Sequence, residues 1–333
     1  MSAALALTMG EPSGVGAEIT IKAWQRLCAS GPAFFYCGSA VLVETTAHAL
    51  GLDVPVIRIS EPVQARAAFD RGLPVMDFPL EDEVTPGAAS PSHAGAVINV
   101  IETAVRFAME GQAAGIVTNP IQKHSLHQAG FPHPGHTEFL QALSGPASRA
   151  VMMLAGGGLR VVPVTIHEAL RSAIDRLTPA LIIETGLAAA RGLQRDFGIA
   201  TPRLAVAGLN PHAGENGDMG DEEETIVRPA VAGLRAQGID AFGPLSPDTM
   251  FTARARGSYD AALCLYHDQA LIPLKTLAVD EGVNVTLGLP FVRTSPDHGT
   301  ALDIAGKGIA DPGSLIAALR LAATIAAHRE ATS

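Results

Sequence analysis

Five short apolar runs of this chain end in polar, turn-forming residues, and helical patterns separate most of them. The runs end at Gly10-Glu11, Thr118-Asn119, His167-Glu168, Asn210-His212 and Tyr266-His267. Buried strands that alternate with helices predict an α/β fold with a largely parallel sheet. Because ligands of such sheets bind at the carboxyl ends of the strands, these polar ends are the first candidates for a functional site.

The pattern also predicts where individual elements lie. We expect strands at 3–9, 33–37, 54–59, 115–118 and 204–209, two strands joined by a glycine turn within 150–170, and helices at 94–109, 177–194 and 314–328. The segment 71–92 is rich in proline, glycine and acids and is expected to be a loop. Thr137 precedes a helical run and is a candidate N-cap.

Composition excludes several classes of protein. The chain has 333 residues, enough for two domains, and 47% of them are hydrophobic while 17% are charged, which is typical of a well-buried globular protein. A net charge of -10 argues against a nucleic-acid partner. No apolar stretch is long enough for a membrane helix, and we expect no signal peptide, because the N-terminal apolar run has no positive flank and stops at Gly10. Three cysteines without a C-x-x-C pair indicate free thiols, so we expect a cytoplasmic protein.

Three of the five strand ends carry a histidine, and these three form a candidate metal site. Imidazoles of His167, His212 and His267 could bind one divalent ion and leave a position open for substrate. Ordinary hydrogen-bonded histidines are the alternative interpretation. Asp268 follows His267 directly and could orient its ring.

Polar residues after the last of these strand ends are those that a small anionic substrate needs. Lys275 and Arg293 could clamp a carboxylate and a phosphate. A metal that contacts an alcohol lowers its pKa, which suits alcohol oxidation followed by decarboxylation of a β-keto acid. Glycines at 10, 14 and 16 make a loop that could meet an anion, although a plain strand-to-helix turn is the simpler interpretation.

Several motifs, in this order, resemble the 4-hydroxythreonine-4-phosphate dehydrogenase family over essentially the whole chain. They are MGEPSGVGAEI, TNPIQK, PGHTEFL, VTIH, LNPHAGENGDMGDEE, PDTMF, YHDQALIPLK and LPFVRTSPDHGTALDIAGKG. The resemblance implies an isocitrate/isopropylmalate dehydrogenase-like fold of two α/β/α domains with the active site in a cleft between them. By analogy we expect 1–130 with 285–333 to form the first domain and 131–284 the second, which carries the metal histidines.

The resemblance also implies roles for individual residues. The family's metal ligands fall on His167, His212 and His267. Its substrate contacts fall on His136, Thr137, Lys275, Asn284 and Arg293, and cofactor contacts are expected at Asp297, His298, Gly299 and Thr300. Asp248, Lys275 or a metal-bound water is a candidate general base, and Asp268 has a catalytic or supporting role. Family members are homodimers whose active sites are completed across the interface.

The implied reaction is oxidation of 4-phosphooxy-L-threonine at C3 by NAD, or NADP, and decarboxylation to 3-amino-2-oxopropyl phosphate in pyridoxal phosphate biosynthesis. Zinc fits three imidazoles best, and magnesium, manganese or cobalt remain alternatives. A dehydrogenase for 4-phospho-D-threonate or 4-phospho-D-erythronate is a second hypothesis. A metal-dependent hydrolase without NAD and a non-catalytic sugar-phosphate binding protein are the remaining ones.

Overall fold

A computed structural model describes residues 3–146 and 148–332, which divide into two compact units. Unit 1 comprises the chain up to Ala150 together with Leu289–Ala331, and unit 2 comprises Val151–Gly288. The sequence places the first crossing near 130 and the return near 285. In the structure residues 131–150 stay with unit 1, where helix α6 (His136–Leu143) packs against helix α4 (Ala94–Met109).

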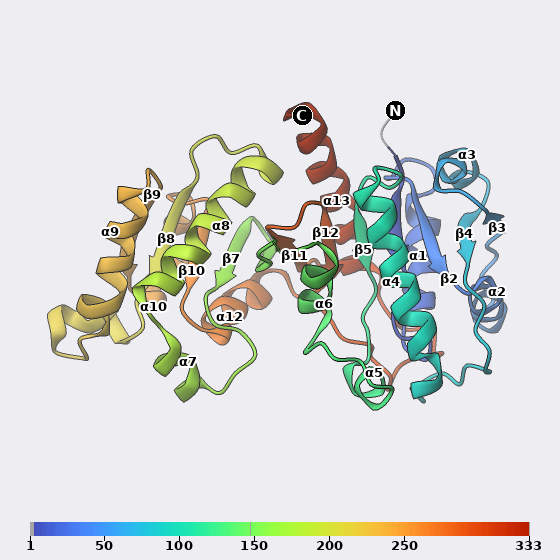
Figure 1. Cartoon of the computed structure of the whole chain (residues 1–333), viewed down its shortest axis with the longest axis horizontal. Coiled ribbons are helices and arrows are strands. Elements are labelled where there is room, and N and C mark those ends of the chain that lie inside the picture. The colour runs from blue at the N-terminus through green and yellow to red at the C-terminus, as the bar shows by residue number, and fades with distance from the viewer. Residues whose placement is uncertain (1–2, 147, 333) are drawn as a thin grey trace. The chain divides into compact units, whose positions relative to one another are not determined.

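Unit 1 is built on a parallel sheet (Figure 1, blue to green and red). Its strands are β1 (Leu5–Thr8), β2 (Phe34–Gly38), β3 (Val56–Ile59), β4 (Leu73–Asp77), β5 (Ile116–Thr118) and β12 (Arg293–Pro296). The order is β3-β4-β2-β1-β5-β12, and all the recorded pairs are parallel. Strands β1 and β2 are fully buried, as expected for a sheet covered on both faces.

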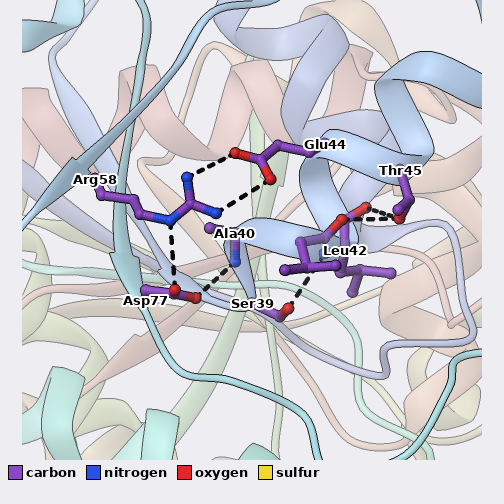
Figure 2. A network of polar contacts seen from close by, with 8 residues as sticks. Ser39, Ala40, Leu42, Glu44, Thr45, Arg58 and Asp77 are labelled. Carbon is purple, nitrogen blue, oxygen red and sulfur yellow. Dashed lines mark hydrogen bonds and ion pairs between the residues drawn. The ribbon is translucent and has the colours of Figure 1, made fainter.

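Helices connect the strands of unit 1. They are α1 (Gly16–Leu27), α2 (Ala40–Ala49), α3 (Ala65–Phe69), α4, α5 (Lys123–Gln128), α6 and α13 (Gly313–Thr332), with 3₁₀ turns at Pro62–Gln64 and Pro91–His93. Helix α4 packs its apolar face on β1 and β2, because Val97, Ile101 and Val105 recur at helical spacing. Helix α2 begins after Ser39, whose side chain accepts the N–H of Leu42 and so caps it (Figure 2).

Two local predictions for unit 1 are wrong. The segment 71–92 contains β4, which Gly72 and Pro74 hid by breaking the strand pattern. Thr137 is not the N-cap of α6, because the helix begins two residues earlier than that cap implies, and Gly135 occupies the cap position without a side-chain hydrogen bond.

Unit 2 has a mixed but mainly parallel sheet. Its strands are β6 (Val151–Gly156), β7 (Leu159–Pro163), β8 (Arg203–Ala207), β9 (Asp240–Leu245), β10 (Ala261–Cys264) and β11 (Val283–Leu287), in the order β11-β6-β7-β10-β8-β9. The pairs among β7, β10, β8 and β9 are parallel, whereas β6 is antiparallel to both β7 and β11. The prediction of an α/β fold with a mostly parallel sheet is therefore confirmed.

Helices and turns complete unit 2. They are α7 (Leu170–Arg176), α8 (Pro179–Phe197), α9 (Arg228–Ala236), α10 (Pro247–Met250), α11 (Ala253–Arg256) and α12 (His267–Ala278), with a turn at Pro211–Gly217 and a π-turn at Glu223–Val227. Helix α12 packs on β6, β7 and β10 through Ala270 and Leu274, which join the core cluster of this unit. Within the described residues, no helix combines the length and apolar character needed to cross a bilayer.

Candidate functional site

The three candidate metal histidines follow three neighbouring strands of unit 2. His167 comes after β7, His267 after β10 and His212 after β8. Strand β10 lies between the other two and is parallel to both. All three histidines therefore follow strand ends at the same edge of the sheet, which is where α/β proteins bind ligands.

His167 and His267 lie next to each other at this edge. Their ring centroids are 5.4 Å apart. They line a cavity of about 320 Å³ together with Ile166, Glu168, Leu170, Ala173, Tyr266 and Asp268. The Nδ1 atom of His267 is 2.7 Å from Asp268 Oδ1, so the carboxylate holds the ring with Nε2 as the nitrogen that could bind a metal.

His212 is exposed and lies on a loop with unusual backbone geometry. Residues 212–216 all have positive φ, between 42° and 78°. Glu223 fastens the start of this loop: its Oε1 accepts the N–H groups of Leu209 and Asn210, each at 2.7 Å, and its Oε2 accepts the Asn210 side chain at 2.9 Å. Across 3–146 and 148–332, no three His, Cys, Asp or Glu side chains are grouped closely enough to hold a metal.

The other candidate residues of unit 2 are more dispersed. Lys275 lies two turns after His267 on α12, so the two share a helix face. Asn284 lies on β11, and its buried Oδ1 has no hydrogen-bond partner. Asp248 is exposed on α10, accepts a hydrogen bond from Ser246 and does not line the histidine cavity.

In unit 1, a group of cationic side chains surrounds the start of α6. Arg293, at the start of β12, is buried and donates through Nη2 to Thr118 Oγ1 at 2.8 Å. A Cβ atom placed on Gly135 would lie 3.3 Å from Lys123 Nζ, so this ammonium group lies against the helix start. His136 is the first residue of α6, and the helix start has no side-chain cap. Cationic side chains and uncapped N–H groups together favour an anion such as phosphate.

The electrostatics of this group agree with an anion site. Burial lowers the pKa of His136 well below its ordinary value, and the positive charges of Arg293 and Lys123 lower it further. The buried Nε2 of His136 has no hydrogen-bond partner. Burial also lowers the pKa of Arg293 to about 10, which still leaves it charged at neutral pH. A bound phosphate would offset the repulsion among these cations.

The predicted cofactor segment adjoins the first loop of unit 1. The carbonyl of Thr300 accepts the N–H of Val15, and a Cβ on Gly14 would come within 2.8 Å of that carbonyl. His298 Nδ1 is 2.9 Å from the carbonyl of Gly299, and the N–H of Asp297 donates to Ser314. In the first loop, the N–H groups of residues 11 and 13–15 all have protein partners, which supports a strand-to-helix turn rather than a phosphate cradle.

Two residues important to these arrangements had no clear signal in the sequence. Lys123 stands in a helical segment and belongs to no motif assigned to substrate, and only the fold brings it to the start of α6. Glu223 belongs to the acidic run 221–224 that suggests solvated capping charge, but it is 1% exposed. Burial separates it from its neighbours in that run, and burial depends on the fold.

Comparison with known proteins identifies the family. The family model described as "Pyridoxal phosphate biosynthetic protein PdxA" matches residues 31–322. The chain is 54% identical to 4-hydroxythreonine-4-phosphate dehydrogenase of Caulobacter vibrioides over 98% of each chain, and 55% identical to that of Methylorubrum populi over 97% and 94%.

Comparison with solved structures leads to the same family. The 4-hydroxythreonine-4-phosphate dehydrogenase of Klebsiella pneumoniae superposes with a TM-score of 0.87 at 40% identity, covering 98% of both chains. A terephthalate 1,2-cis-dihydrodiol dehydrogenase of Burkholderia xenovorans is more distant, with a TM-score of 0.65 at 29% identity over 97% and 98% of the two chains. This chain belongs to the PdxA family of pyridoxal phosphate biosynthetic proteins.

Proposed function

We propose that the chain oxidises 4-phosphooxy-L-threonine at its C3 hydroxyl with NAD as hydride acceptor. The resulting 3-oxo acid loses carbon dioxide and gives 3-amino-2-oxopropyl phosphate, for pyridoxal phosphate biosynthesis. The observation that carries this proposal is the identity of more than half the residues with dehydrogenases named for this substrate, over almost the whole of each chain.

The phosphate of the substrate is held at the start of α6. Arg293 and Lys123 supply positive charge, and the uncapped N–H groups of the helix, with Thr137, supply donors. His136 is neutral before substrate arrives, because its pKa is lowered. A phosphate dianion beside it would raise that pKa, in the direction that favours a third positive charge next to Arg293 and Lys123. Lys275 and Asn284 are further substrate-binding residues of this proposal.

His167, His212 and His267 would together hold one divalent ion, with zinc the best match to three imidazoles, although the three side chains are not grouped closely enough in this structure to hold it. The adjacent rings of His167 and His267, and the Asp268 carboxylate that directs Nε2 of His267 outward, support this assignment. When bound, the ion supplies Lewis acidity toward the substrate oxygens. His212 must be positioned by its loop, which Glu223 fastens.

Hydride transfer needs the nicotinamide cofactor beside C3. The segment Asp297–Thr300, which is hydrogen-bonded to the first loop, contacts the cofactor. A base takes the hydroxyl proton as the hydride leaves, and Lys275 and Asp248 are the candidates within the chain. After decarboxylation a proton is returned to the carbon that carried the carboxylate.

We also place this protein in the cytoplasm as a homodimer. Unpaired thiols at Cys28, Cys37 and Cys264 suit a reducing compartment. Apolar side chains are exposed on the two helices of unit 2 that follow His167 and begin at His267: Leu170 and Ile174 on α7 are 55% and 37% exposed, and Ile272 on α12 is 64% exposed. A second copy that covers these side chains would remove them from water beside the site.

The test is NADH formation with 4-phosphooxy-L-threonine and with 4-phospho-D-threonate, each with and without a chelator. We expect turnover of the L-threonine compound, loss of activity with chelator and recovery when zinc is returned. Turnover of only the D-compound would refute the substrate, and turnover that chelator leaves unchanged would refute the metal. NADH from neither compound would refute the dehydrogenase proposal.

A further inference from the structure

A buried glutamine of unit 2, Gln269, joins two of the strand ends that lead to the candidate metal histidines. It lies in the first turn of α12, two residues after His267, and is 6% exposed. Its Oε1 accepts the N–H of Leu265 at 2.6 Å, and its Nε2 donates to the carbonyl of Gly208 at 2.7 Å. Leu265 directly follows β10, and Gly208 directly follows β8. One side chain therefore spans the ends of two neighbouring parallel strands.

A threonine extends this connection to the third strand end. Thr165 lies just after β7, two residues before His167, and is 2% exposed. Its Oγ1 donates to the carbonyl of Leu265 at 2.8 Å. Three buried hydrogen bonds thus cross the ends of β7, β10 and β8. Because buried polar groups cost free energy when they lose their partners, these bonds favour one arrangement of the three strand ends.

Gly208 passes this restraint to the loop of His212. A Cβ atom on Gly208 would lie 2.8 Å from the Cα atom of Ala213 and 3.2 Å from Glu223 Oε1. The backbone at 208 therefore lies directly against the loop and against the carboxylate that fastens it. Since His212 is the neighbour of Ala213 in the chain, a shift of Gly208 would displace the backbone that carries His212.

Helix capping is the simpler explanation for Gln269, and it accounts for only one of the two bonds. The third residue of a helix often reaches back to an N–H group near the helix start, as Oε1 does here. The bond to Gly208 joins residues 61 apart in the chain and satisfies no group of the helix. Both bonds together need a side chain that accepts from a backbone N–H and donates to a backbone carbonyl, which an amide does.

We propose that Gln269 is a positioning residue of the histidine site: it holds the strand end that carries His212 in place relative to the one that carries His267. The inference deepens the proposed function and rests on the metal site proposed there. Within the part of the chain that the structure describes, the three histidines are not grouped closely enough to hold a metal. By fixing the strand ends, Gln269 limits the change that grouping them requires to the side chains and the exposed loop of His212.

The test compares Gln269→Met with Tyr259→Phe. Methionine is as long and unbranched as glutamine but has no amide, so this variant loses both bonds while it fills the same space. Tyr259 gives the matched control, because it is also 6% exposed and its hydroxyl donates to the carbonyl of Met250 at 2.9 Å. It lies before the start of β10, whereas the bonds of Gln269 lie after the ends of β10 and β8.

Zn²⁺ binding is measured by competition with a chelator, and Co²⁺ binding by its visible absorption. We expect Gln269→Met to weaken Zn²⁺ binding about 10- to 100-fold and to change the Co²⁺ spectrum in the same direction as His212→Ala. Tyr259→Phe should keep the wild-type affinity and spectrum even if its melting temperature falls as far. Amide hydrogen exchange should accelerate in Gln269→Met alone at Leu209, whose N–H shares a peptide group with the Gly208 carbonyl.

A second variant, Gln269→Glu, separates positioning from capping. At pH 8 the ionised carboxylate still accepts from Leu265 but cannot donate to Gly208. Positioning predicts that this variant also loses Zn²⁺ affinity, whereas capping alone predicts the wild-type affinity, which would overturn the proposal. If Gln269→Met does not fold, Gln269→Glu decides the question.

A wild-type Zn²⁺ affinity and Co²⁺ spectrum in Gln269→Met would overturn the proposal. So would equal losses in Gln269→Met and Tyr259→Phe, because these would reflect general destabilisation. A wild type that binds neither ion would refute the proposed metal site, and hydrogen exchange then decides the role of Gln269: faster exchange at Leu209 in Gln269→Met supports it, and unchanged exchange overturns it. These measurements need no turnover, so their outcome is separate from that of the NADH assay.

Discussion

Replacing Glu223 by glutamine should loosen the loop that carries His212. The buried carboxylate accepts two backbone N–H groups through Oε1, and the Asn210 amide through Oε2. A glutamine side chain in its place could keep its oxygen toward the backbone, but its NH₂ group would then face the NH₂ group of Asn210. The variant thus loses a charged acceptor and gains a contact between two donors.

The magnitude follows from these three bonds. A hydrogen bond to a charged group contributes about 1.5–3 kcal/mol, and one between neutral groups about 0.5–1.5 kcal/mol. Losing about 1 kcal/mol at each of three bonds predicts that the free energy of unfolding of unit 2 falls by about 3 kcal/mol. For a unit of this size, that corresponds to a fall in melting temperature on the order of 10 °C.

Calorimetry of Glu223→Gln tests this, with Glu224→Gln as the control. Glu224 is 49% exposed and pairs with Arg228 at 2.6 Å, a surface pair one helical turn apart that contributes only about 0.3–0.5 kcal/mol. Amide hydrogen exchange at Leu209 and Asn210 should accelerate in Glu223→Gln alone, and zinc affinity should fall. If both variants melt at the wild-type temperature, or if the two amides keep their protection, the assigned role of Glu223 is wrong.

Three further outcomes are expected. Arg293→Lys loses the planar group that reaches Thr118 and should raise KM for the phosphorylated substrate about tenfold without changing KM for NAD, as steady-state kinetics will show. Because the pKa of His136 is lowered in the folded protein, the unfolded chain binds a proton before the folded chain does as pH falls below 6.5, and the folded state loses stability. His136→Asn removes this group, so the melting temperature should fall less steeply on the acid side in a plot against pH. Asp268→Asn removes the anionic partner of His267 Nδ1 and should weaken zinc binding about 10- to 100-fold in a chelator competition, while the melting temperature of the metal-free protein changes little.

The sequence predicts the fold class because apolar runs and helical periodicity are local signals. The helix at 94–109 has the predicted bounds, since its apolar positions repeat without interruption. Strand β4 was not predicted, because Gly72 directly before it and Pro74 and Asp77 within it interrupt the apolar pattern. Parallel pairing with β2 and β3 nevertheless stabilises the strand. Pairing across the sheet is a property of the fold and leaves no period in the sequence.

For the candidate site, too, the sequence predicts local features but not which residues the fold brings together. The sequence predicts that the three histidines follow strand ends. It does not predict that β7, β10 and β8 are neighbours, because strand order depends on the fold. The cationic group around α6 depends on Lys123 and Arg293, which are far apart in the chain and meet through β5, β12 and the helix start.

The loop after β8 connects stability to function most directly. His212, Ala213, Glu215 and Asn216 have left-handed backbone, which costs L-residues roughly 1–2 kcal/mol each, so this loop stores roughly 4–8 kcal/mol of strain. Such strain persists only where the surroundings impose it, and it concentrates at functional sites. Here the Glu223 carboxylate holds the residues just before the loop and lies against it, since a Cβ on Gly214 would come within 2.6 Å of that carboxylate. The strain is therefore an observation, separate from sequence similarity, that supports the proposed role of His212.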